Sequence, residues 1–197
     1  MSMISIDSEW ICGNSIPSES FVCGFCNVRI SSAKGFKLFS KQIRGHSRSK
    51  TRGGIYICDN CNGPTFISEA RHQYPLPAFG SSVKNVPQNI NTLYEEARNG
   101  TKAKNYTSSV LLCRKILMHI AVEKGAEPGL PFIGYVNFLE ENHYVPPDSR
   151  SWVNRIRVRS NEANHEIEIM TQTDAENLIT FIEIILRFLY ETPSLIR

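Results

Sequence analysis

The stretch ENLITFIEIILRFLY, residues 176–190, decides the class of fold expected for the larger part of this chain. Its polar side chains, Glu176, Glu183 and Arg187, are seven and four residues apart, so on a helix they line one narrow stripe. Nearly every other position is apolar, whereas a helix on the surface of a monomer usually has a narrower apolar face. We therefore expect a helix from Thr173 or Asp174 to about Tyr190. It is either the central helix of a bundle or partly covered by a second subunit, and the second reading is favoured.

N-terminal to this helix, the same 3.6-residue periodicity of apolar residues predicts four more helices. The first is expected from Pro87 to Arg98, with Asn99-Gly100 as its stop signal. The next two are expected at about 104–124 and 131–142. A fourth is expected after Pro146-Pro147-Asp148, through Trp152, Ile156 and Val158. Residues 87–197 are thus predicted to form a helical bundle, and the fold class is mainly α.

A change in amino-acid composition marks the boundary of this bundle. Residues 71–87, RHQYPLPAFGSSVKNVP, contain three prolines, a glycine and a pair of serines, which suits an extended connection. We assign residues 71–86 to a linker and residues 1–70 to a small β-rich module.

The small module has two Cys-x-x-Cys pairs, CGFC at 23–26 and CDNC at 58–61, with 31 residues between them. Four thiolates on two tight turns suit tetrahedral zinc, so Cys23, Cys26, Cys58 and Cys61 are the predicted ligands of a structural zinc ion in a zinc ribbon. Disulfides or a redox pair are the alternatives, and both fit an intracellular chain less well. Cys12 is the rival ligand and His46 a possible substitute, while Cys113 lies in an apolar context typical of a core thiol.

Positive charge is concentrated between the two pairs. Eight of the 22 Lys and Arg residues lie between Cys26 and Cys58, with no Asp or Glu, although the net charge is only +3. Such a segment suits a polyanion, so RNA or another nucleic acid is the expected partner. The candidate RNA-binding residues are Lys34, Lys37, Lys41, Arg44, Arg48, Lys50 and Arg52. Phe36 and Phe39, which stand among them, could stack on bases; we interpret them instead as part of the module's own core.

Residues 154–169, NRIRVRSNEANHEIEI, hold the candidate catalytic groups. Arg159 can bind a phosphate, His165 can move a proton near neutral pH, and Asn161 can orient either group or cap a helix turn. Each residue also has a structural alternative. Arg159 could form a surface ion pair with a neighbouring glutamate, and His165 could be hydrogen-bonded within the bundle. Arg114, in an apolar face of the second helix, needs a partner and could join this group or pair with Glu183 or Glu123.

From Val86 to Thr192 the sequence resembles the family of domain of unknown function 4145, within the wider HEPN group of helical domains. The likeness is carried by LYEEA (93–97), LLCRKIL (111–117), IRVRSNEANH (156–165) and ITFIEIILRFLY (179–190). Family members often have I-R-x-x-G-N-x-x-x-H, to which Arg157, Asn161 and His165 correspond, while Ser160 replaces the glycine. Many HEPN proteins are metal-independent ribonucleases that act as dimers through an Arg and a His four to six residues apart. That implies a HEPN-like bundle with Arg159 and His165 as the pair and Arg157 as the competing arginine.

Composition and resemblance together predict a cytoplasmic, homodimeric HEPN-type endoribonuclease in bacterial defence or toxin-like RNA control. A protein partner in a defence system is possible, and no membrane association is expected, because no long apolar run and no secretion signal occur. The alternative is a non-catalytic HEPN-like module that binds nucleic acid or a nucleotide, or a partner subunit of a defence complex. A protein-interaction scaffold is a third reading, which the basic segment disfavours.

Overall fold

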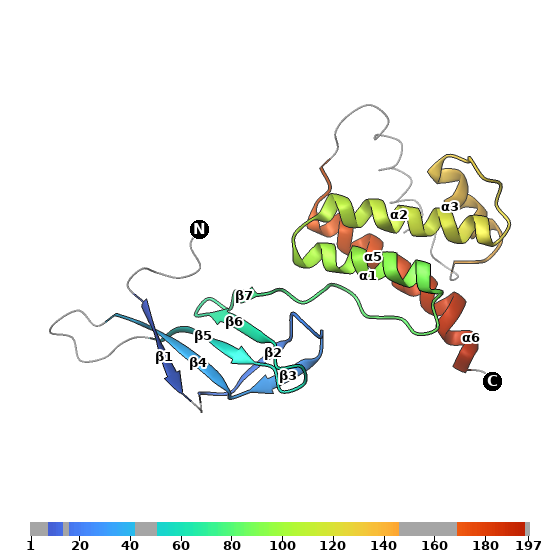
Figure 1. Ribbon diagram of the computed structural model, residues 1–197. Helices are drawn as coiled ribbons and strands as arrows, with labels where there is room; N and C mark the ends of the chain where they lie inside the picture. The colour runs from blue at the N-terminus through green and yellow to red at the C-terminus, as the bar shows by residue number, and fades with distance from the viewer. Residues whose placement is uncertain (1–7, 14–15, 42–50, 146–168, 196–197) are drawn as a thin grey trace. The chain divides into compact units, whose positions relative to one another are not determined.

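The computed structural model describes residues 8–13, 16–41, 51–145 and 169–195 and divides the chain into two compact units (Figure 1). The first unit, Met1–Pro77, is built from strands, and the second, Ala78–Arg197, from helices. The expected succession of a β-sheet part and a helical part is confirmed. The division between Pro77 and Ala78 falls inside the segment assigned to the linker, residues 71–86.

The N-terminal unit contains an antiparallel five-stranded sheet and a two-stranded hairpin. The sheet has the strand order β1 (Ser8–Gly13), β4 (Gly35–Ser40), β5 (Thr51–Ile57), β6 (Pro64–Ser68) and β7 (Gln73–Tyr74). The hairpin consists of β2 (Glu19–Val22) and β3 (Arg29–Ser32). The register between β4 and β5 is irregular at Leu38/Phe39, where Gly53 takes a φ of 133° that other residues rarely adopt.

The core of this unit lies around the two Cys-x-x-Cys turns. Its buried residues are Phe21, Cys23, Cys58 and Ile67, with Cys26, Ile30 and Tyr56 packed against them. Phe36 and Phe39 are absent from this cluster, and Phe36 is 39% exposed, so its predicted core role is wrong. Leu38, two residues further along β4 and on the same side of the strand, is the residue that becomes fully buried.

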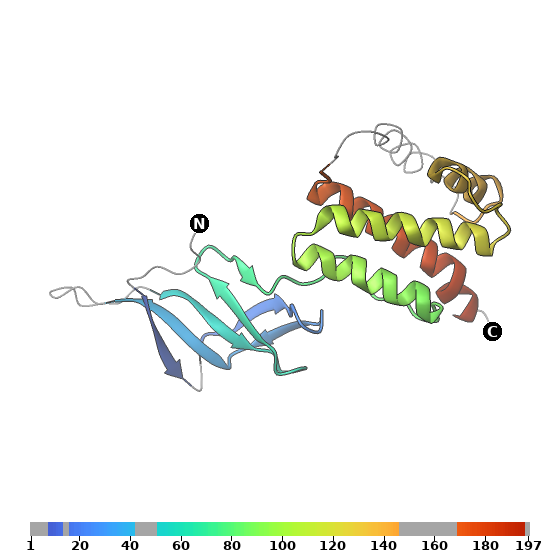
Figure 2. The same ribbon diagram turned by 45° about the horizontal axis from the view of Figure 1, so that its top comes forward.

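The helical unit contains four α-helices of two or more turns in the part of the chain that the structure describes (Figure 2). They are α1 (Gln88–Lys102), α2 (Tyr106–Glu123), α3 (Phe132–Glu141) and α5 (Gln172–Leu186). A π-helical turn, Arg187–Glu191, and the short helix α6 (Thr192–Leu195) extend α5. The helix predicted through Trp152 lies outside the described residues. None of the described helices has the length and apolar content needed to cross a bilayer.

Helix α1 does not stop at Asn99-Gly100 as predicted but continues to Lys102. Gly100 is a packing residue rather than a stop signal, because a Cβ there would lie 2.4 Å from the Ser109 Oγ on α2. Ser109 is fully buried and donates a hydrogen bond to the Ala97 carbonyl, 2.8 Å away. The glycine thus allows α1 and α2 to approach closely.

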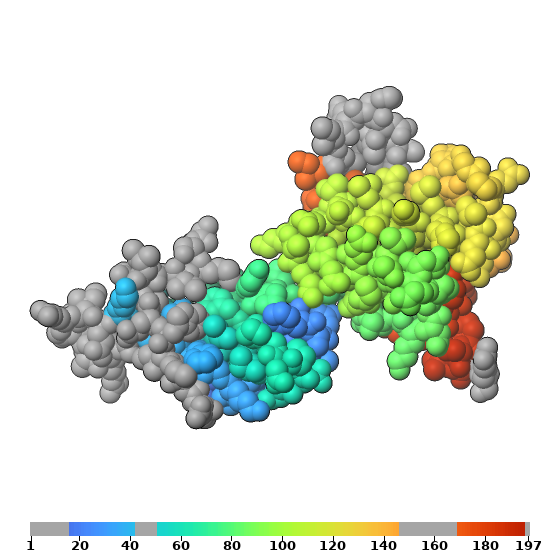
Figure 3. Space-filling model, in the orientation of Figure 1, coloured from blue at the N-terminus to red at the C-terminus, as the bar shows by residue number. Residues whose placement is uncertain are grey.

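Helix α5 is the most buried helix of the unit. Its buried residues are Ala175, Leu178, Ile179, Phe181, Ile182, Ile185 and Leu186. In Figure 3 the atoms of α1 and α2 form most of the visible face of the helical unit, and α5 shows only at its edges. Packing within the chain therefore accounts for most of its apolar surface. The predicted N-cap is also corrected: Thr171 caps the helix, and Thr171 and Asp174 form a capping box.

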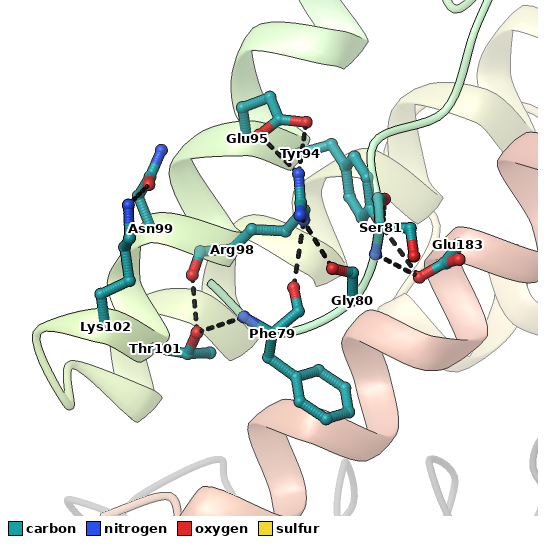
Figure 4. Close-up of polar contacts among 10 residues, drawn as sticks. All are labelled: Phe79, Gly80, Ser81, Tyr94, Glu95, Arg98, Asn99, Thr101, Lys102 and Glu183. Atoms are coloured by element: carbon teal, nitrogen blue, oxygen red, sulfur yellow. Dashed lines mark hydrogen bonds and ion pairs between the residues drawn. The ribbon is translucent and has the colours of Figure 1, made fainter. Parts of the chain in front are cut away.

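The segment Phe79–Ser81 is held against α1 and α5 by a buried arginine (Figure 4). Arg98, 4% exposed, donates to the carbonyls of Phe79 (3.0 Å) and Gly80 (2.8 Å) and forms an ion pair with Glu95. The backbone N–H of Ser81 donates to Glu183 on α5 at 2.8 Å. We call this arrangement the Arg98 clasp.

Candidate metal centre

The four predicted zinc ligands come together on two hairpin turns. Cys23 and Cys26 lie on the turn between β2 and β3, and Cys58 and Cys61 on the turn between β5 and β6. Their sulfur atoms all lie within 4.8 Å of one another. The Cys23–Cys61 and Cys26–Cys58 sulfur pairs, one from each turn, are 3.7 and 3.8 Å apart.

Each turn is shaped by an asparagine directly after its second cysteine. Asn27 and Asn62 have φ values of 59° and 57°, in the left-handed region that asparagine tolerates better than most residues. Their N–H groups donate to the carbonyls of Cys23 and Cys58 at 2.9 and 2.8 Å. These two asparagines were not predicted from the sequence, although the order Cys-x-x-Cys-Asn occurs twice in it.

Close packing covers both turns. A Cβ on Gly63 would lie 2.5 Å from the Phe25 ring, and a Cβ on Gly24 would lie 2.3 Å from the Pro75 carbonyl oxygen. The Phe25 N–H also donates to the Cys23 sulfur at 3.4 Å. Cys23 and Cys58 are fully buried, while Cys61 is exposed, so the centre lies at the surface with one open side.

The thiols are unequal as acids. Burial opposes ionisation of Cys26, but hydrogen bonds from the Val28 backbone and the Asn60 side chain outweigh it and lower the pKa to about 6. For Cys61, a hydrogen bond from the Gly63 backbone favours the thiolate. Desolvation and hydrogen bonds with the other three thiols outweigh it and raise the pKa to about 12. A bound divalent cation would favour the thiolate form of these cysteines.

The donor set fits a zinc ion. Zinc bonds to thiolate sulfur at about 2.3 Å, which places the sulfurs of a tetrahedron roughly 3.8 Å apart. Two of the observed separations, 3.7 and 3.8 Å, match that value. The four cysteines can therefore hold one metal ion such as zinc in a closed site without an open catalytic position.

The candidate RNA-binding residues are only partly described, because Arg44, Arg48 and Lys50 lie outside the described residues, as does His46. Lys34 pairs with Asp59 at 2.9 Å and Arg52 with Glu69 at 3.1 Å, both at the surface. Lys41 is exposed at the end of β4. Two acidic residues thus contact this segment, Asp59 on the second turn and Glu69 directly after β6. Exposed pairs of this kind contribute little stability. Cys12 belongs to β1, and its side chain is not described.

Of the residues predicted for catalysis, only Arg114 is described. Its guanidinium lies over the Phe132 ring of α3, 4.4 Å from the centroid, in a cation–π contact. The carboxylates suggested as its partners have other contacts: Glu183 binds Arg187 at 3.0 Å, and Glu123 accepts a hydrogen bond from Tyr190 at 3.4 Å. Arg157, Arg159, Asn161 and His165 lie outside the described residues, so their grouping stays a prediction.

Cys113 is fully buried in the helical core, as its apolar context predicted, and burial raises the pKa of its thiol. Arg98 is a buried charge that was not predicted from the sequence. Its signal was an arginine at the end of YEEAR, about two helical turns after Ile90, where the buried face of α1 begins.

Comparison with known proteins gives one match. A family model described as domain of unknown function (DUF4145) matches residues 95–196, which is more than half of the chain. No curated protein and no solved structure matches the chain.

Proposed function

The chain belongs to the DUF4145 family, and from this premise we propose that it is a homodimeric, metal-independent endoribonuclease of HEPN type that carries a zinc ribbon. Its proposed role is bacterial defence or toxin-like RNA control. The observation that carries the proposal is that one chain joins this family domain to a four-cysteine unit whose turns flank a basic segment free of acidic residues.

The zinc ribbon is proposed from the four-cysteine cluster. Two hairpin turns supply two sulfurs each, and the sulfurs are spaced as tetrahedral zinc requires. The ion is structural in this proposal, because four thiolates leave no position for water or substrate. Its task is to hold β4 and β5, which carry the basic residues, against the hairpin of β2 and β3.

RNA binding is proposed for the basic segment. Residues 27–57 contain eight Lys and Arg residues and no Asp or Glu. Phosphate contacts by such residues supply affinity that does not depend on sequence and that falls steeply with salt. Lys34 and Arg52 meet their carboxylates at the surface, where an RNA phosphate can compete for them.

Cleavage is proposed for Arg159 and His165. The imidazole of one His165 takes the proton from a ribose 2′-hydroxyl, whose oxygen attacks the adjacent phosphorus. The bond from phosphorus to the 5′ oxygen breaks, and the His165 of the second subunit protonates that leaving oxygen. The products are a 2′,3′-cyclic phosphate and a 5′-hydroxyl end. Arg159 stabilises the charge that builds on the phosphate, and Asn161 orients it.

A homodimer would bring two such pairs together. Two apolar side chains one turn apart on the C-terminal helix remain at the surface, Ile184 at 40% and Phe188 at 41% exposure. They lie on the same side of the helix, because residues four apart are neighbours on a helix surface. A second copy is the proposed partner of this strip.

The test is an RNA cleavage assay in buffer free of magnesium, with the chain, a His165→Ala variant and a His119→Ala control. His119 is exposed and bonded to Asn89, so its loss leaves the proposed site unchanged. We expect cleavage by the chain and the control, cyclic phosphate ends, and a loss of at least about 100-fold for His165→Ala.

In cells, expression of the chain should arrest growth, and expression of the His165→Ala variant should not. Absence of cleavage by a concentrated dimer, combined with tight and salt-sensitive RNA binding, would contradict the nuclease. That result would favour the non-catalytic nucleic-acid-binding module.

A further inference from the structure

The four cysteines of the metal centre differ in their access to solvent. Cys23 and Cys58 are fully buried, Cys26 is partly exposed, and Cys61 is exposed. Thiolates react with dissolved peroxides, and a reaction of this kind needs access to the sulfur atom. Cys61 is therefore the cysteine of the cluster at which an oxidant from solvent would react first.

The Cys61 sulfur has a second cysteine sulfur in contact with it. Cys23, on the other turn and 38 residues earlier in the chain, places its sulfur 3.7 Å away. A disulfide bond is about 2.0 Å long, so the two sulfurs would need to approach each other by roughly 1.7 Å, which side-chain rotation can supply. An oxidised Cys61 would thus meet its reaction partner inside the same centre.

Contacts between protein groups also hold these two sulfurs in place. The ring of Phe25, on the first turn, packs so closely on Gly63, after the second turn, that a Cβ there would lie 2.5 Å from it. The N–H of Phe25 donates to the Cys23 sulfur at 3.4 Å, and the Gly63 backbone forms a hydrogen bond with Cys61. The contact of the two turns therefore involves more than the cysteines themselves.

We propose that Cys61 is an oxidation site for hydrogen peroxide, and that its oxidation forms a Cys23–Cys61 disulfide and releases the metal ion. The Cys61 thiolate attacks one peroxide oxygen, the O–O bond breaks, and hydroxide leaves, which makes Cys61 a sulfenic acid. The Cys23 thiolate then attacks the Cys61 sulfur, the S–O bond breaks, and a second hydroxide leaves. Two thiolates lose two electrons in total, and one peroxide gains them.

This disulfide would exchange one link between the turns for another. Only the thiolates of Cys26 and Cys58 remain for the metal ion, whereas a structural zinc ion needs four ligands. The new covalent bond joins the same two turns, so the sheet can stay folded without the metal. The inference rests on the proposed zinc site and is independent of the proposed RNA cleavage.

The test uses the full chain loaded with zinc and treated with hydrogen peroxide. A zinc-sensitive dye follows release of the metal, and mass spectrometry locates disulfides after free thiols have been blocked with N-ethylmaleimide. Cys61→His removes the exposed sulfur and keeps four zinc donors, since three cysteines and one histidine also form structural zinc sites. Cys26→His is the matched control, because it changes a partly exposed ligand and keeps both Cys23 and Cys61. The disulfide map of the unsubstituted chain decides the pairing even if a variant binds no zinc.

We expect the unsubstituted chain to release its zinc together with formation of the Cys23–Cys61 disulfide, while the buried Cys113 stays reduced. Cys61→His should slow the release at least about 10-fold, and Cys26→His should release zinc within about twofold of the unsubstituted rate. The circular dichroism of the sheet should persist after oxidation and disappear after chelation. A thiol reductant and added zinc should restore the original state.

Disulfides within each turn, Cys23–Cys26 and Cys58–Cys61, would overturn the proposed pairing. Equal release rates for the unsubstituted chain and Cys61→His would show that the exposed sulfur is not the oxidation site. Retention of zinc at peroxide concentrations that oxidise a free cysteine would overturn the inference and leave the zinc site intact. Absence of zinc from the untreated chain, after growth with zinc, would overturn the zinc site together with the inference.

Discussion

Arg98 shows how a single charged residue can be essential inside an apolar bundle. Its guanidinium is 4% exposed, yet its N–H groups reach two backbone carbonyls and the Glu95 carboxylate. Thr101, one turn later, accepts a hydrogen bond from the Phe79 N–H at 3.1 Å. A buried charge is tolerated only when it is paired in this way, so Arg98 binds the start of the helical unit to α1.

Replacing Arg98 with methionine keeps most of the side-chain volume but leaves the Phe79 and Gly80 carbonyls without their donors. We expect the free energy of unfolding of the helical unit to fall by about 3 kcal/mol. Urea denaturation followed by helical circular dichroism measures this loss. Lys102→Met, which removes only an exposed contact with Asn99, is the control and should change stability by less than about 0.5 kcal/mol. Equal effects of the two substitutions would show that the Arg98 clasp contributes no stability.

At the scale of elements, the contact between α1 and α2 depends on a glycine within a helix. A glycine in a helix interior costs about 1 kcal/mol relative to alanine, so its presence at Gly100 needs a reason. The reason is steric, since a Cβ at this position would overlap the buried Ser109 Oγ. Local helix propensity is here less important than the distance between two helices.

Gly100→Ala should therefore destabilise the helical unit by about 1–2 kcal/mol, although alanine is the better helix former. Ser109→Ala should cost about 1 kcal/mol, because its hydrogen bond to the Ala97 carbonyl is lost. The double variant removes the steric conflict, so it should be more stable than the sum of the single changes by at least about 1 kcal/mol. Urea denaturation of all four proteins measures the coupling, and additive effects would rule out the steric explanation.

At the scale of the whole molecule, the two units have separate cores of very different size. The core of the helical unit draws on all four of its longer helices. The core cluster described for the N-terminal unit has four buried residues, and two of them are cysteines of the four-cysteine cluster. A unit with so small a core needs further stabilisation, and its four cysteines can supply it by holding a metal ion.

Chelation should therefore unfold the N-terminal unit and leave the helical unit folded. One zinc ion per chain is expected by elemental analysis, and strong chelators should release it and make the four cluster thiols reactive. The helical circular dichroism signal should stay nearly constant, while the sheet signal is lost. Cys58→Ser should reproduce this state without chelator, and Cys113→Ala should retain the zinc. A loss of the helical signal on chelation would show that the two units are not independent.

The sequence by itself determined those features that depend on local pattern. Two Cys-x-x-Cys pairs require only a tight turn each, so the four cysteines that come together could be named in advance. The periodicity of residues 104–124 and 131–142 located α2 and α3 within one or two residues. The N-cap at Thr171 was missed by two residues only, because two threonines and an aspartate compete there.

Tertiary structure alone decided which residues face which neighbour. Gly100 was predicted to end a helix, because its role depends on Ser109 of another helix, nine residues later in the chain. Phe36 was predicted to be buried, but it pairs with Ile55 of β5 and is 39% exposed, whereas Leu38 on the same side of β4 is fully buried. Burial and close approach arise between elements that are distant in sequence, so no local pattern encodes them. The catalytic prediction at Arg159 and His165 is of this kind, since it requires two subunits to bring the same short stretch together.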